Sequence, residues 1–79
     1  MDDETLMDLL TEVTDLLNEA RFLEECDDAI RHLQCAETVE TVSDLIANLD
    51  EAAAAAKKKS IARQCKQLAA KCRRAEAAR

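Results

Sequence analysis

The sequence lacks glycine, proline, tryptophan and tyrosine, and it has one phenylalanine in 79 residues. Average usage would give about five or six glycines and about four prolines in a chain of this length. Without glycine, backbone positions with positive φ are costly, and without proline no rigid turn is marked. β-Branched and aromatic residues are sparse, which disfavours strands, whereas abundant alanine, leucine, glutamate, lysine and arginine favour helices. The composition therefore predicts an all-α protein.

The same absences exclude several kinds of site. Phosphate-binding loops and EF-hand calcium loops require glycine. The single histidine, His32, cannot supply the two Glu-x-x-His units of a di-iron bundle. Cys35 lies three residues from His32, but neighbours on a helix surface offer no third group to orient the base and no substrate pocket. We therefore expect a protein that is not an enzyme and that needs no cofactor and no metal.

Apolar side chains recur with a helical period in four stretches of the chain. At 100° per residue, the stripe within residues 6–20 and the stripe that begins at Phe22 point about 150° apart. A continuous helix drifts only about 20° per heptad, which places a break near Asn18 to Arg21. Repeating this comparison along the chain predicts helices over about 3–18, 22–35, 39–57 and 61–77.

Capping residues support these boundaries. Asp2 or Asp3 can cap the first helix, Thr38 the third and Ser60 the fourth. Helices of about 15 to 19 residues with short connections predict one domain over residues 1–79, folded as a small up-down-up-down four-helix bundle. Two stacked αα-hairpins are the alternative, although the two halves of the chain show no sequence repeat.

Charge is distributed unevenly along the chain. Residues 1–51 carry sixteen acidic and two basic side chains, residues 57–79 carry nine basic and one acidic, and the total is −6. We interpret the basic fourth helix as docked among acidic helices. A nucleic-acid or membrane surface is the alternative, but the negative total and the lack of exposed aromatic residues argue against both partners. The residues of this basic face are Lys57, Lys58, Lys59, Arg63, Lys66, Lys71, Arg73 and Arg74.

Four cysteines, Cys26, Cys35, Cys65 and Cys72, lie on or beside the expected apolar stripes of the second and fourth helices. The members of each pair are two or more helical turns apart, so the four cannot converge on one tetrahedral metal ion. Reduced core thiols are the first interpretation. Disulfides between the second and fourth helices are the second, and they require a topology that makes these helices adjacent.

The segment "LMDLL" matches an LxxLL pattern through Leu6, Leu9 and Leu10. Such segments dock as helices into partner grooves, and the acidic, leucine-rich stretch from Leu6 to Leu17 has that character. The same leucines are also the apolar stripe of the first helix, so using them on a partner would disrupt the bundle. We regard them first as core residues.

Together these patterns predict a non-enzymatic helical bundle, either a de novo designed scaffold or a small protein-binding module, as a monomer or a homodimer. Two alternatives remain: a receptor-binding ligand of cytokine-like architecture, and an acidic regulatory module that uses Leu6 to Leu17. The acidic start of the chain predicts no signal peptide. No apolar run approaches the roughly 18 residues of a membrane span, so a soluble protein is expected.

Overall fold

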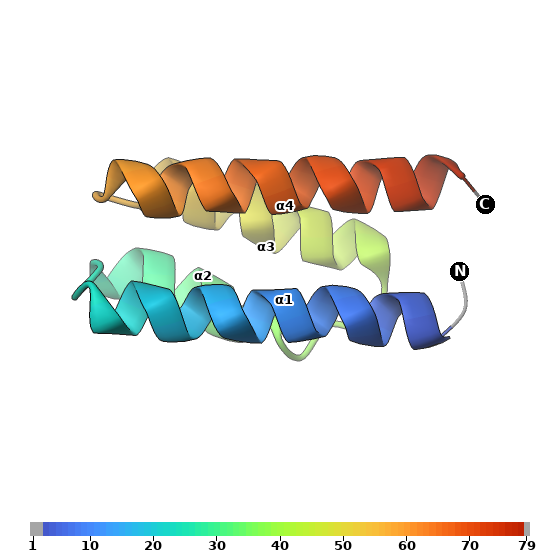
Figure 1. Ribbon diagram of the computed structural model, residues 1–79, viewed down its shortest axis with the longest axis horizontal. Coiled ribbons are helices and arrows are strands. Elements are labelled where there is room, and N and C mark those ends of the chain that lie inside the picture. The colour runs from blue at the N-terminus through green and yellow to red at the C-terminus, as the bar shows by residue number, and fades with distance from the viewer. Residues whose placement is uncertain (1–2, 79) are drawn as a thin grey trace.

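The computed structural model describes residues 3–78, which form four α-helices and no strand. The helices are α1 (Asp3–Phe22), α2 (Asp27–Ala36), α3 (Val42–Ala55) and α4 (Lys59–Ala77). Each packs against the next along the chain, and α4 returns to pack against α1 (Figure 1). The structure thus confirms a small all-α four-helix bundle of up-down-up-down order.

A single apolar cluster fills the space between the helices. Its most deeply buried large side chains include Leu17, Leu33, Leu45, Leu49 and Ile61. α3 packs closely against both α2 and α4, whereas α1 packs less closely against its two neighbours. Among the described residues, no helix combines the length and the apolar character needed to cross a membrane.

The second helix is much shorter than the first, with 10 residues against 20. It therefore lies beside only the C-terminal half of α1, and the connection that follows it turns away near the middle of α1 (Figure 1). There the Thr14 hydroxyl donates a hydrogen bond of 2.8 Å to the Glu37 carboxylate. Beyond this point, towards the start of α1, Leu6 and Leu10 are half-buried.

The break after α1 lies four residues later than the stripes predicted. α1 continues through Asn18 to Phe22, and the chain reverses at Glu24, whose φ is 59°. The N–H of Glu25 bonds to the carbonyl of Ala20, and the N–H of Glu24 bonds to that of Arg21. This is a Schellman motif in which glutamate occupies the left-handed position that glycine usually takes. The break is real, but Asn18 does not terminate the helix.

Phe22 was assigned to the apolar side of the second helix, and this assignment is wrong. It lies in the last turn of α1 with 85% of its surface exposed. Because α1 continues past Asn18 in the same phase, the position of Phe22 falls on the outer side of that helix.

Replacing Glu24 with glycine should raise the free energy of unfolding by about 0.5 to 1 kcal/mol, because glycine has no Cβ to strain the left-handed conformation. Urea denaturation followed by circular dichroism measures this change. The same substitution at Glu19, inside α1, should lower stability by about 1 kcal/mol. A loss of stability in Glu24→Gly would contradict the role assigned to the turn.

The other helix ends also differ from the sequence-based boundaries. α3 is capped by Thr41, whose hydroxyl accepts from the Asp44 N–H at 3.2 Å, and Thr38 instead bonds back to the Cys35 carbonyl of α2. α3 ends at Ala55, and α4 begins at Lys59, so Ser60 lies inside its first turn rather than capping it. Asp3 opens α1, and Asp2 lies outside the described residues.

Candidate functional site

An open groove with a volume of about 420 Å³ lies between α1 and α4. These two helices lie side by side and antiparallel along the full length of the bundle (Figure 1). The floor of the groove is formed by Leu16 and Leu68, which are nearly buried. Its walls are polar and are formed by Glu12, Asp15, Gln64, Gln67, Lys71 and Arg74.

Helical spacing explains why the two walls carry opposite charge. On α1, the residues at positions 8, 12, 15 and 19 share one side of the helix, and all four are acidic. We call Asp8, Glu12, Asp15 and Glu19 the acidic row. On α4, positions 63, 67, 71 and 74 share the corresponding side. We call the cations among them, Arg63, Lys71 and Arg74, the basic row.

One ion pair joins the two rows within the protein. The Lys71 ammonium lies 2.7 Å from the Glu12 carboxylate, with both side chains about half exposed. On the other side of α4, Arg73 pairs with Asp50 of α3. α4 is therefore docked against acidic side chains of both neighbouring helices. Exposed pairs of this kind stabilise by only about 0.2 to 1 kcal/mol each, so they direct the packing more than they strengthen it.

The remaining cations of the predicted basic face project into solvent. Within residues 3–78 these six side chains form no ion pair, although all are exposed. They are Lys57, Lys58, Lys59, Arg63, Lys66 and Arg74. The structure divides them: Arg63 and Arg74 belong to the basic row beside the groove, whereas the three lysines at the α3–α4 connection lie at one end of the bundle.

A buried carboxylate that the sequence patterns did not reveal lies at the same end. Glu25, in the α1–α2 turn, is only 4% exposed. One of its oxygens accepts from the N–H of Cys26 at 2.9 Å and from that of Lys57 at 2.7 Å, and the other accepts from the N–H of Lys58 at 2.9 Å. Glu25 therefore fixes the α3–α4 connection directly before α4, whose N-cap position, Lys58, has no side-chain capping bond.

Two opposing effects set the pKa of Glu25. Burial raises this pKa, but the three backbone N–H groups, together with the Cys26 side chain, lower it by more in total, so the carboxyl pKa lies below its ordinary value. Two of its three hydrogen-bond donors, Lys57 and Lys58, lie more than thirty residues away, so no local pattern could identify this role.

The four cysteines are free thiols in different surroundings. Cys65 and Cys72 are buried in the core, Cys26 is half-buried and Cys35 is exposed. Burial, and then the negative charge of Glu25, raise the pKa of the Cys65 thiol to about 11. Burial, and then Glu12, raise the pKa of Cys72 to about 11, while Lys71 and Arg73 oppose the shift. Both core thiols are therefore protonated at neutral pH and are weak nucleophiles.

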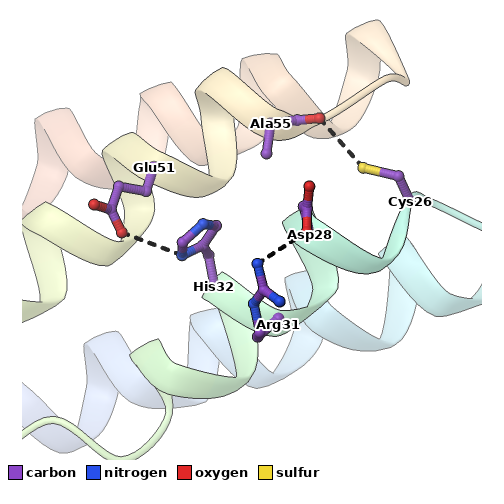
Figure 2. Close-up of polar contacts among 6 residues, drawn as sticks. All are labelled: Cys26, Asp28, Arg31, His32, Glu51 and Ala55. Carbon is purple, nitrogen blue, oxygen red and sulfur yellow. Dashed lines mark hydrogen bonds and ion pairs between the residues drawn. The ribbon is translucent and has the colours of Figure 1, made fainter.

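The single histidine lies between α2 and α3. Figure 2 shows its Nδ1 facing the Glu51 carboxylate, 3.2 Å away, with Cys26 and Ala55 farther along the same helix pair. Asp28, one turn before His32, pairs with Arg31 instead. Among the described residues no group of three or more histidine, cysteine or acidic side chains could hold a metal ion. His32 and its partner join two helices on the side away from the groove.

The leucines of the LxxLL pattern belong to the core. Leu9 is 3% exposed, and Leu6 and Leu10 are half-buried against the same cluster. Comparisons of this chain with protein-family models, curated proteins and solved structures found no match.

Proposed function

We propose that the protein is a non-enzymatic protein-binding module and that the groove between α1 and α4 binds a helical segment of its partner. The main support for this proposal is the groove, in which an apolar floor lies between walls of opposite charge. An amphipathic helix fits such a groove with its apolar face on Leu16 and Leu68. A basic edge of that helix would face α1, and an acidic edge would face α4.

The surroundings of the reactive groups support a binding role rather than catalysis. The core thiols are shielded and protonated, and the imidazole of His32 is engaged by Glu51 on another side of the bundle. The groove is lined by no thiol, hydroxyl or imidazole, and its polar residues are carboxylates, amides and cations. A binding surface with orienting charges needs no more than this.

Local geometry favours a binding module over a designed scaffold. Idealised designs avoid positive φ outside glycine and give each helix a side-chain cap. Here Glu24 has a φ of 59°, and Cys26 and Lys58 occupy N-cap positions without a side-chain capping bond. The alternative that uses Leu6 to Leu17 on a partner is less well supported, because it needs the whole leucine stripe, and Leu9 and Leu17 of that stripe are buried in the core.

Binding to helical peptides of defined charge tests the proposal. A peptide with a leucine seam, one basic edge and one acidic edge should bind in titrations with the protein at about 1 µM, and peptides with two acidic or two basic edges should bind at least about tenfold more weakly. Asp15→Lys reverses one charge of the α1 wall and should weaken the mixed-edge peptide about tenfold.

The matched control is Glu40→Lys, the same charge change in the exposed α2–α3 connection. Isothermal titration calorimetry of both variants gives the comparison. Equal binding of all three peptides, or equal losses in the two variants, would refute a binding site in this groove.

A further inference from the structure

The charges of the bundle are separated between two opposite faces. α1 carries six acidic residues and one basic residue, and α4 carries six basic residues and one acidic residue. The pair of helices is therefore neutral as a unit. Residues 27–55, which comprise α2, α3 and their connection, carry seven acidic residues and one basic residue. The formal charge of −6 of the whole chain thus resides on the face opposite the groove.

The two rows beside the groove are matched along the bundle axis. Glu12 and Lys71 lie at one level, since they form an ion pair. Both helices rise 1.5 Å per residue and run antiparallel, so Glu19 lies near the level of Arg63, and Asp8 near that of Arg74. These last four side chains are exposed and form no ion pair among residues 3–78.

We propose that the partner at this groove is a second copy of the chain, packed through the same α1/α4 face about a two-fold axis that runs parallel to the helices. This deepens the proposed function and rests on it, because it uses the same opposed charges of α1 and α4, although the helices of the second copy lie over α1 and α4 and not within the groove. A rotation about such an axis places α1 of each copy opposite α4 of the other and keeps every residue at its level. The acidic row of each protomer then faces the basic row of its partner at all three levels.

The other two-fold arrangement is disfavoured by the same charges. An axis perpendicular to the helices in the plane of the interface would place α1 against α1 and α4 against α4. Like charges facing each other across an interface oppose association and thereby select the partner orientation. In the favoured dimer, the two strongly acidic faces formed by α2 and α3 point away from each other, which minimises repulsion between copies.

The size of the face sets the expected strength. The Cα trace of the bundle spans 35 × 17 × 15 Å, so its long face offers no more than the roughly 800 Å² per partner of a standard interface. A small interface oriented by exposed charges gives a weak and salt-sensitive dimer. We expect a dissociation constant on the order of 100 µM at low salt.

Sedimentation velocity from about 10 µM to about 1 mM protein tests the dimer, and two charge-reversed variants test its orientation. Arg63→Glu with Arg74→Glu makes both rows acidic at the levels of Asp8 and Glu19, and Asp8→Arg with Glu19→Arg makes both rows basic at those two levels. Each variant alone should be monomeric over this range. An equimolar mixture should dimerise at least as tightly as the unmodified chain, because each row then faces its opposite in the other variant.

The control is Asp27→Arg with Glu40→Arg, which matches the charge change of Asp8→Arg with Glu19→Arg but lies on the opposite side of the bundle. The dissociation constant of its dimer should stay within the same order of magnitude as that of the unmodified chain. Circular dichroism checks that each variant folds. If a reversal prevents folding, the neutral pairs Arg63→Gln with Arg74→Gln and Asp8→Asn with Glu19→Gln replace it, and each should weaken the dimer about tenfold.

A chain that stays monomeric to about 1 mM, a mixture that does not associate, or a dimer that both reversals leave intact would overturn the self-association proposal. The peptide titrations distinguish the two proposals, because they use protein at about 1 µM, far below the expected dissociation constant of the dimer. Peptide binding by a monomeric chain leaves the groove function standing with a different partner. Self-association without peptide binding removes the groove function alone.

Discussion

Replacing Glu25 with alanine is expected to lower the free energy of unfolding by about 3 kcal/mol, because three backbone N–H groups lose a charged acceptor. A domain of 79 residues has a total stability of roughly 4 to 12 kcal/mol, so this one side chain contributes a large share. Urea denaturation at pH 7, followed by circular dichroism, measures the change. Glu40→Ala, in an exposed connection, should shift stability by less than about 0.5 kcal/mol. Similar small losses in both variants would contradict the role of Glu25 as the acceptor for these three N–H groups.

The pH dependence of stability provides an independent check on the same carboxylate. The folded-state pKa of Glu25 lies below the ordinary value of 4.5, so its contribution is fully present above pH 4.5. The contribution is lost as the pH falls below 4.5 and through the folded-state pKa. Glu25→Gln removes the charge at every pH. The stability gap between the unmodified chain and Glu25→Gln should therefore be constant from pH 7 to pH 5 and should shrink towards pH 3. A gap that persists unchanged at pH 3 would show that the charge of Glu25 is not involved.

Leu49→Ala is expected to lower the free energy of unfolding by about 3 kcal/mol, whereas Phe22→Ala should change it by less than about 0.5 kcal/mol. Leu49 is fully buried in α3, the helix that packs closely on both sides, so its truncation leaves a cavity. Phe22 has 85% of its surface in solvent, so little buried area is lost when it is shortened. Urea denaturation of the two variants gives the comparison. A larger loss in Phe22→Ala would mean that the only aromatic residue is part of the core.

The helical class, the number of helices and their order were predictable from the sequence because apolar side chains repeat with the helical period. Leu9, Leu16, Leu45 and Leu49 lie where those stripes placed them, in the buried cluster. The helix ends were not predictable to the same degree. Helix ends are usually marked by glycine and by local side-chain caps. This chain has no glycine, and the N-cap residues of α2 and α4, Cys26 and Lys58, form no side-chain capping bond.

The misplaced boundaries have specific physical causes. Glu24 takes the left-handed position without the glycine that would have marked it, so the end of α1 was assigned four residues early. Phe22 was consequently assigned to the wrong helix. Ser60 was assigned as a cap, but α4 begins at Lys59, and the connection before it is fixed by Glu25, which lies 32 residues earlier in the chain than Lys57. An acceptor supplied from another part of the chain leaves no local signature.

The groove followed from the sequence only in part. The charge asymmetry of the chain indicated that α4 would dock against acidic helices, and Lys71 and Arg73 do so. The arrangement of the four helices in the bundle decides which cations remain exposed beside α1. That arrangement is set by packing between distant segments, so Arg63 and Arg74 could not be separated from the rest of the basic face beforehand.

The short second helix divides the bundle into two parts of unequal cohesion. At the end that holds Glu25, four helices enclose the core, and one carboxylate joins two chain reversals. Towards the other end, only α1, α3 and α4 continue, and an extended connection replaces the fourth helix (Figure 1). Proteins open first where fewer buried contacts must be broken, in units smaller than the whole domain. The first two turns of α1, with the half-buried Leu6 and Leu10, can therefore detach at a smaller free-energy cost than global unfolding, while the four-helix end keeps its native packing.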